Sequence, residues 1–404
     1  MAPAFPSAKL ILNPGLDRAR PYGPAERDIL SVEKARAASE TIRGWPGYAP
    51  TPLVRLGPVA REAGVAEVLY KDEGRRFSLK SFKALGGAYA VERLATARGA
   101  AGLTVACATD GNHGRAVAWG AQRVGARAVV FVHEGVSRGR AEAIAALGAE
   151  VVRAGATYDE SVRLCAEAAR QNGWEIVSDT SWPGYEDVPR TVMQGYAVVA
   201  MEARDQGARP THVFVQAGVG GFAAAVLSWL WETLGAERPV LVAVEPENAA
   251  CLYASAEAGA PKGVGGGLDT IMAGLACGEP SRLAWAILGP GADAFMAIPD
   301  EAAEEAMRDL AGLGVAGGES GVAGLAGFRL AARDPPMRAA LRLDARSRVL
   351  LFGTEGATDP EVFSGIVGRT AEEVERSPEA IPDMSRNQTG SGAEPDREPR
   401  PAPR

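Results

Sequence analysis

The stretch with the clearest chemical potential is Lys71–Ala90, KDEGRRFSLKSFKALGGAYA, which centres on Lys83. Lys83 lies between apolar neighbours and is followed by small residues, which suits an amine partly removed from water. Desolvation disfavours the ammonium form and lowers the pKa of such an amine. A free amine can condense with an aldehyde. Taken alone, however, a lysine at a helix start is more often an ordinary surface residue, so the assignment depends on the motifs elsewhere in the chain.

A glycine-rich turn at Gln216–Gly221 lies between an expected strand and an expected helix. Exposed backbone N–H groups and the positive end of the helix dipole would hold a phosphate there. The string GVGGFA also imitates the dinucleotide fingerprint G-x-G-x-x-A, with Glu245 at the end of the next strand to take ribose hydroxyls. A tight turn that lets the helix pack is the third possibility. No Gly-Lys-Ser/Thr follows, which excludes a nucleoside-triphosphate loop.

Four more polar turns follow strands or open helices: residues 108–114 (ATDGNHG), 178–182 (SDTSW), 318–321 (GESG) and 354–356 (TEG). Turns at the carboxyl ends of parallel strands line ligand crevices. Each turn also has a purely structural explanation. Asp110 and Asn112 are common helix caps, His113 could be a buried structural histidine, and Asp179 could be a turn residue.

The elements that must position these turns alternate between strand and helix. We expect strands at residues 68–71, 104–108, 128–133, 150–153, 175–178, 211–216, 240–244 and 348–352, and helices at 24–42, 114–125, 137–147, 158–172, 222–234, 300–313 and 318–333. Such alternation indicates βαβ units and parallel sheets, so the fold class is α/β. Residues 222–234 are apolar on all sides, which predicts a fully buried helix.

Composition restricts the class of protein. The 404 residues are 47% hydrophobic and 23% charged, and this length fits about two domains. A net charge of −7 argues against a nucleic-acid or acidic-membrane partner. No run of 18 apolar residues predicts a membrane span, and no convincing secretory signal is present, so the expected location is cytoplasmic. With three histidines and no C-x-x-C pair among four cysteines, no metal site is expected.

Together the motifs resemble those of fold-type II pyridoxal-phosphate (PLP) enzymes, the class of tryptophan synthase β and threonine dehydratase, from about residue 48 to residue 367. Within this class the chain is similar to the diaminopropionate ammonia-lyases. The strings that carry the similarity are KDEGRRFSLKSFKALGGAYA, ATDGNHGRAVAW, SDTSWPGY, MQGYA, QAGVGG, TIMAGLACGEP and GESG. Threonine and serine dehydratases have a small residue where this chain has Asp110.

The resemblance implies a PLP cofactor and a role for several residues. Lys83 would form the Schiff base, and Asn112 would bond the phenolic oxygen. The phosphate would lie against Gly218, Val219, Gly220 and Gly221. The Thr354 hydroxyl would lie near the ring nitrogen and leave it largely unprotonated.

The implied reaction is α,β-elimination of D- and L-2,3-diaminopropionate to pyruvate and two ammonia. The enantiomers present the α-hydrogen to opposite cofactor faces, so two bases are needed. Lys83 would serve the L isomer and Asp110 the D isomer, with Asp179 holding or protonating the departing amine. Charge-assisted hydrogen bonds from the extra substrate ammonium to aspartates would select this substrate over serine. The alternatives are a serine/threonine-type dehydratase, a nicotinamide-dependent oxidoreductase and a non-catalytic cofactor-binding protein.

The resemblance also implies a homodimer of two-domain subunits, each domain an open sheet flanked by helices. We expect a large domain from residues 1–84 and 206–368, a small domain from 85–205, and a disordered tail from 369–404. Cys251 and Cys277 could approach each other as a disulfide or remain two thiols. The chain departs from the family pattern in a short segment between Gly87 and Thr104 and in Ala357 after TEG.

Overall fold

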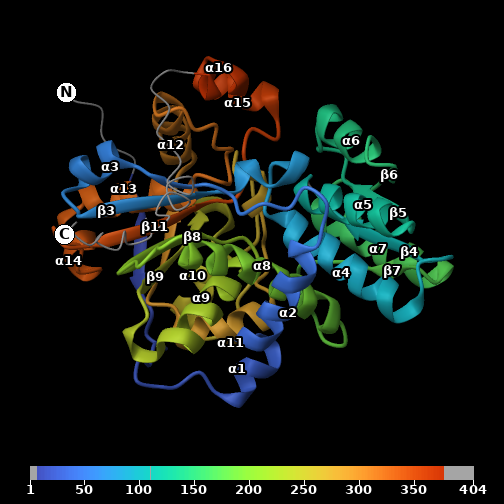
Figure 1. Cartoon of the computed structure of the whole chain (residues 1–404), viewed down its shortest axis with the longest axis horizontal. Coiled ribbons are helices and arrows are strands. Elements are labelled where there is room, and N and C mark those ends of the chain that lie inside the picture. Colours follow the sequence, from blue (N-terminus) through green and yellow to red (C-terminus); the bar gives the residue numbers. More distant parts are fainter. Residues whose placement is uncertain (1–6, 110, 377–404) are drawn as a thin grey trace, which may run out of the picture.

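The computed structural model describes residues 7–109 and 111–376 and contains two β-sheets flanked by helices (Figure 1). The α/β prediction is therefore confirmed. The larger sheet has seven strands in the order β1-β10-β9-β8-β11-β3-β2, and the smaller has four in the order β6-β5-β4-β7. Their helices meet at α8 (Asp187–Asp205), which packs against both α4 (Lys83–Arg98) and α9 (Gly221–Leu234).

The larger sheet is parallel except at its two edges, where β1 and β2 run antiparallel to their neighbours. Side chains of β8 alternate between two apolar cores: Val213 and Val215 face the core that contains α9, and Phe214 faces the core that contains α13. A strand with an apolar core on each face reads as a continuous hydrophobic run. The strands are β1 (Lys9–Leu12), β2 (Leu53–Arg55), β3 (Glu67–Asp72), β8 (His212–Gln216), β9 (Val240–Pro246), β10 (Ala294–Ile298) and β11 (Arg348–Gly353).

Helices cover both faces of this sheet. The apolar helix α9 is buried over most of its length, as the sequence predicts, and it packs on α8 and α11, while α13 crosses β8 to β11. The helices of this part are α1 (Pro24–Ile29), α2 (Val32–Arg43), α3 (Gly57–Ala63), α9 (Gly221–Leu234), α10 (Cys251–Ala258), α11 (Arg282–Gly291), α12 (Asp300–Gly312), α13 (Ala323–Arg333), α14 (Pro335–Ala340), α15 (Pro360–Val367) and α16 (Ala371–Glu375).

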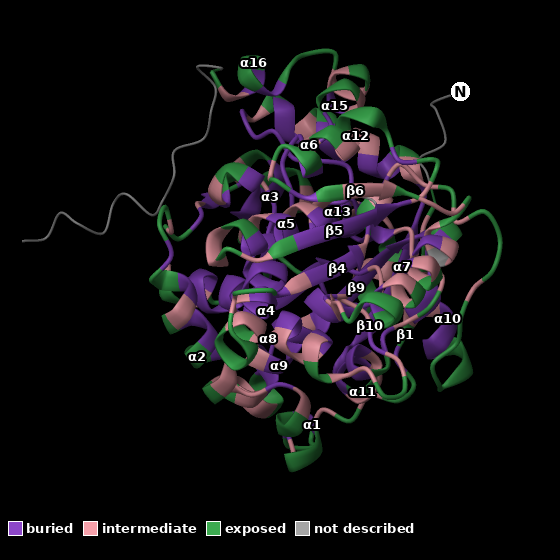
Figure 2. Ribbon diagram, turned by 90° about the vertical axis from the view of Figure 1, so that its right-hand side faces the viewer, coloured by how far each residue is buried: buried purple, intermediate pink, exposed green. Residues whose placement is uncertain are grey.

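The smaller sheet is entirely parallel, and Figure 2 shows β4 and β5 buried along most of their length. Its strands are β4 (Thr104–Ala108), β5 (Arg127–Val132), β6 (Glu150–Arg153) and β7 (Glu175–Ile176). The helices of residues 83–205 are α4 (Lys83–Arg98), α5 (Asn112–Val124), α6 (Arg138–Ala145), α7 (Tyr158–Asn172) and α8 (Asp187–Asp205).

The small residues after Lys83 have a packing role. A Cβ atom on Gly86 would lie 2.3 Å from Cε1 of Tyr196, and one on Gly195 would lie 2.0 Å from the Leu85 carbonyl oxygen. Such contacts are far below van der Waals separation, so glycine at both positions lets α4 and α8 approach closely. The base of the lysine helix is therefore fixed against α8.

Several predicted boundaries are wrong. The helix expected at residues 24–42 is divided, because Ser31 is extended and its hydroxyl accepts from the Lys34 N–H to begin α2. The helix expected at 318–333 begins at Ala323. Residues 371–375 form α16, with Val374 buried, although the sequence predicts disorder from 369; residues 377–404 lie outside the described residues. Strands β1 and β10 and helix α11 were not predicted.

Candidate active site

The polar turns identified in the sequence converge on one cavity, which encloses about 1150 Å³ including its open mouth. Its lining includes a member of each turn: Lys83, Asn112, Asp179, Gly218, Val219, Gly220, Gly221, Ser320 and Thr354. Asp110, the remaining predicted catalytic residue, lies outside the described residues.

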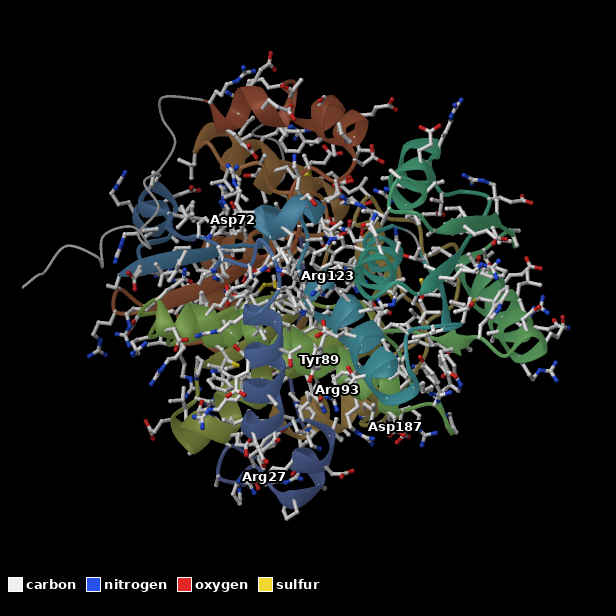
Figure 3. The ribbon with its side chains drawn as sticks, turned by 45° about the vertical axis from the view of Figure 1, so that its right-hand side comes forward. Arg27, Asp72, Tyr89, Arg93, Arg123 and Asp187 are labelled. Atoms are coloured by element: carbon white, nitrogen blue, oxygen red, sulfur yellow. The ribbon has the colours of Figure 1, made fainter. Side chains whose placement is uncertain are left out.

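The lysine segment is fixed to the end of β11. Strand β3 ends at Asp72 (Figure 3), and the chain then passes through two short 3-10 turns to Lys83, the first residue of α4. Phe82 N–H donates to the Thr354 carbonyl at 3.1 Å, and Ser81 forms a β-bridge with Glu355. The Schiff-base candidate and the ring-nitrogen candidate are therefore held together by the backbone.

The Lys83 ammonium forms an ion pair with Asp179 from the turn after β7. Burial disfavours the ammonium, but Asp179 more than offsets this, so the pKa of Lys83 is raised. Burial likewise opposes ionisation of Asp179, yet Lys83 holds the pKa of Asp179 below its usual range. The expectation of a lowered Lys83 pKa is wrong, because it included desolvation and left out the counter-charge of Asp179.

The glycine turn joins β8 to α9 as the sequence predicts. Gly220 has φ +96°, a conformation that favours glycine, and a Cβ atom there would lie 3.0 Å from Cδ1 of Leu288. A Cβ atom on Gly218 would lie 3.0 Å from Sγ of Cys277. The bare turn exposes backbone at the N-terminus of α9, where an anion is stabilised. These residues fit a phosphate group.

The prediction that this turn binds a dinucleotide is wrong, because Glu245, the residue expected to bind the ribose hydroxyls, does not line the cavity. The carboxylate of Glu245 is buried and accepts hydrogen bonds from the N–H groups of Leu252 and Tyr253 at 2.7 and 2.8 Å. Burial raises the pKa of Glu245 to about 8. Glu245 therefore caps the start of α10 and is absent from the residues that line the cavity.

Thr354 is held by Gln216, whose role the sequence analysis missed. The Gln216 side-chain nitrogen shares its two hydrogens among three acceptors: the Thr354 hydroxyl oxygen at 2.7 Å and the backbone carbonyls of Gly321 and Phe352. The threonine O–H then remains available as a donor toward the cavity. The polar end of a strand just before the glycine turn was the only signal for Gln216.

Asn112 and Glu355 form a second polar pair that the sequence analysis did not foresee. The Asn112 amide donates to one Glu355 oxygen, and the other oxygen accepts from the Ser320 N–H at 2.9 Å. Gly111, and not Asn112, is the N-cap residue of α5, so the capping explanation of Asn112 is wrong. The Ser320 hydroxyl accepts from Gly274 N–H at 3.0 Å and thereby joins the GESG turn to TIMAGLACGEP.

Two cysteines, Cys251 and Cys277, are not joined by a disulfide in the structure. Cys251 and Cys277 are present as thiols in the structure, and the Cys251 thiol faces the Gly218 carbonyl oxygen at 3.7 Å.

Within residues 7–109 and 111–376, no group of three His, Cys, Asp or Glu side chains is arranged to hold a metal ion. In the same residues, no helix combines the length and apolarity that crossing a bilayer demands.

Comparisons with known proteins show the family to which the chain belongs. The family model "Pyridoxal-phosphate dependent enzyme" matches residues 45–354. The diaminopropionate ammonia-lyase of Escherichia coli K12 is 41% identical over 369 residues, which are 84% of this chain and 92% of that protein. A crystal structure of the holo E. coli enzyme superposes with a TM-score of 0.82 at 36% identity, covering 90% of this chain and 97% of that one.

A more distant structure supports the fold alone. Threonine deaminase isoform 2 of Solanum lycopersicum has a TM-score of 0.71 at 21% identity, covering 90% of this chain and 98% of that one. Lys83, the glycine turn 218–221 and the Thr354 hydroxyl thus line one cavity in a chain that matches the PLP family over most of its length. The chain belongs to the pyridoxal-phosphate dependent enzymes of fold type II, among the diaminopropionate ammonia-lyases.

Proposed function

We propose that this protein is a PLP-dependent ammonia-lyase that eliminates ammonia from D- and L-2,3-diaminopropionate, giving pyruvate and two molecules of ammonia. The observation that carries the proposal is the ion pair of Lys83 with Asp179 in the cavity that also contains the bare glycine turn. An amine and an anion-binding turn are what an aldehyde-bearing phosphate ester requires. The similarity to diaminopropionate ammonia-lyases supports the choice of substrate.

The residues that would hold the cofactor come from four parts of the chain. Lys83 would bond its aldehyde carbon, and Gly218–Gly221 would bind its phosphate through backbone N–H groups. Asn112 would turn its amide from Glu355 toward the phenolic oxygen, and Thr354 would bond the ring nitrogen. When bound, the cofactor supplies an electron sink for the charge left by the departing α-proton.

Two side chains are assigned to removal of the α-proton and a third to holding the departing amine. Lys83 would remove the α-proton of the L isomer and Asp110 that of the D isomer, from opposite sides. Asp179 keeps its negative charge because Lys83 lowers its pKa. A carboxylate in that state would hold the β-ammonium through a charge-assisted hydrogen bond until it leaves as ammonia.

A pyruvate assay with D- and L-diaminopropionate, serine and threonine tests the function directly. We expect both diaminopropionate isomers to be the preferred substrates, since only they present a second ammonium to Asp179. A higher kcat/KM with serine or threonine would show instead that the protein is a dehydratase of the same fold.

The role of Asp110 is tested by Asp110→Asn. We expect this variant to lose turnover of the D isomer and to keep most of its turnover of the L isomer, because Lys83 is unchanged. Removal of a catalytic base costs roughly 10²–10⁴-fold in rate. Equal losses of kcat/KM on the two isomers would contradict the assignment of Asp110 as the second base.

The division into a large domain (1–84 and 206–368) and a small domain (85–205), the homodimer and the cytoplasmic location are also proposals. The presence of two separate sheets supports the division.

Light scattering of the purified protein tests the dimer: a mass of about twice 42.0 kDa is expected, and a single-chain mass would exclude it.

A further inference from the structure

His113 has one satisfied ring nitrogen and one that faces the catalytic ion pair. It is buried on α5, and its Nε2 atom lies 2.8 Å from the Val177 carbonyl oxygen. Its Nδ1 atom has no hydrogen-bond partner among the described residues and lies 3.8 Å from the Asp179 oxygen that pairs with Lys83. The sequence analysis left open whether His113 is only a satisfied structural histidine. The geometry shows that only half of the ring is satisfied.

The carbonyl contact determines the tautomer. A carbonyl oxygen can only accept, so Nε2 carries the hydrogen, and in a neutral ring Nδ1 presents a lone pair. That lone pair faces a carboxylate, an unfavourable arrangement that is tolerable while the Lys83 ammonium neutralises Asp179. Burial has the largest effect on the pKa of His113 and keeps it below its usual value. The two charged neighbours act in opposite directions: the Asp179 carboxylate raises this pKa, and the Lys83 ammonium lowers it.

Two titratable groups that interact with Asp179, Tyr185 and Cys107, are expected to stay uncharged. The Tyr185 hydroxyl donates to the Ile176 carbonyl and accepts from Ser178 N–H, and burial raises the pKa of Tyr185. Burial also raises the pKa of Cys107 on β4. The charge of His113 in the described structure therefore depends on Lys83 and Asp179.

We propose that His113 is a positioning residue that takes up a proton at Nδ1 when Lys83 loses its positive charge, and that the resulting Nδ1–H holds the Asp179 carboxylate in place. The inference rests on the proposed function, in which the Lys83 nitrogen is charged in one part of the cycle and neutral in another. When the Lys83 ammonium loses one proton, His113 gains one proton, so the total charge of Lys83, His113 and Asp179 does not change. Asp179 stays anionic throughout. Closing the 3.8 Å gap to hydrogen-bond length needs only a small side-chain movement.

His212 provides a matched control within the same chain. It is also buried, and its Nε2 atom lies 2.9 Å from the Leu341 carbonyl oxygen. Its Nδ1 atom, however, lies 2.8 Å from the Thr211 hydroxyl, where His113 faces a carboxylate. His212 thus has the same backbone contact without the ion pair, and its pKa should not respond to Lys83.

The test is the pKa of His113 measured by NMR of histidine-labelled full-length protein in Lys83→Arg and Lys83→Met. The chain has three histidines, so His133→Gln and His212→Gln are enough to assign the signals. Neither Lys83 variant can bond the cofactor, but arginine keeps the positive charge and methionine removes it. We expect the pKa of His113 to be ~1–3 units higher in Lys83→Met, with Nε2 protonated in both variants and His212 unchanged. Equal His113 values, or an equal shift of His212, would overturn the proposal.

A second measurement keeps the proposal testable if Lys83→Met does not fold. Gln can replace the Nε2 donor to Val177, and Asn can replace an Nδ1 donor to Asp179. We expect His113→Gln to lower kcat and to remove one ionisation from the pH profile, and His113→Asn to recover part of kcat without that ionisation. Unchanged pH profiles with equal losses in both would indicate a structural role only. Failure of the proposed function would instead appear as absent pyruvate formation in the wild-type protein.

Discussion

Lys83 and Asp179 form an ion pair in which each partner favours the charged form of the other. The two residues are 96 positions apart in the chain, on the first turn of α4 and in the loop after β7. The sequence indicates Lys83 as the candidate amine through its local surroundings together with the motifs elsewhere in the chain. The sequence does not indicate the charge state of Lys83, because this depends on a carboxylate that only the fold brings near.

Replacement of Asp179 by Asn should lower the pKa of Lys83. The carboxylate raises this pKa, so its removal leaves burial as the dominant effect, and a fall of ~1–3 units is expected. Competitive acetylation of the cofactor-free protein across a pH series, read by peptide mass spectrometry, measures it. Asp187→Asn, an exposed carboxylate at the start of α8, is the control and should leave Lys83 unchanged. An unaltered Lys83 pKa in Asp179→Asn would contradict the ion pair.

At the scale of elements, the strand–glycine turn–helix unit β8–α9 was predictable, and so was the buried character of α9. The side chain that reaches across from the end of β8, Gln216, was not, because its partners Gly321 and Thr354 lie more than a hundred residues away. Strand β10 was missed for a similar reason: a five-residue apolar run, AFMAI, becomes a strand only because β9 and β1 pair with it.

Gly220→Ala should weaken cofactor binding. Alanine at φ +96° is strained by about 1–2 kcal/mol, and its Cβ atom would also press on Leu288, so the turn must shift. We expect the Kd for pyridoxal phosphate, measured by absorbance titration, to rise about tenfold or more. Gly207 also has φ +96° but open space around it, so Gly207→Ala is the control. It should lose stability while keeping its affinity, and an equal Kd in the two variants would show that the turn does not contact the cofactor.

At the scale of the whole molecule, a buried ionic cluster connects the two parts of the structure. Glu202 of α8 accepts from Lys71 of β3 at 2.7 Å and from Arg76 at 2.8 Å, and Arg76 also pairs with Glu73. All four side chains are at most 1% exposed. The two series of alternating strands and helices were predictable, but this cluster was not, since Glu202 lies 131 positions after Lys71 and 126 after Arg76 in the chain.

Glu202→Gln should destabilise the protein at neutral pH and lose that effect in acid. Removing one partner of a buried ion pair costs ~3–5 kcal/mol. Lys71 and Arg76 outweigh the effect of burial and lower the pKa of Glu202 to about 2, so its contribution is present above the ordinary value of 4.5 and is lost as pH falls toward 2. The difference in urea unfolding free energy between wild type and variant should therefore shrink below pH 4.5.

The exposed pair of Arg43 with Asp205, at the end of the same helix, gives the matched control. Asp205→Asn should change the unfolding free energy by less than ~1 kcal/mol at either pH. A Glu202→Gln variant as stable as Asp205→Asn at pH 7 would show that the cluster does not hold α8 to the sheet.

The most direct measurement of the central claim is the position of the cofactor bond. The protein, loaded with pyridoxal phosphate and reduced with borohydride, should lose its yellow absorption and carry the reduced cofactor on Lys83, as read by peptide mass spectrometry. The neighbouring Lys80 provides an internal comparison, because it is absent from the residues lining the cavity and should remain unmodified. Cofactor trapped on Lys80 or another lysine, or no trapped cofactor at all, would contradict the account.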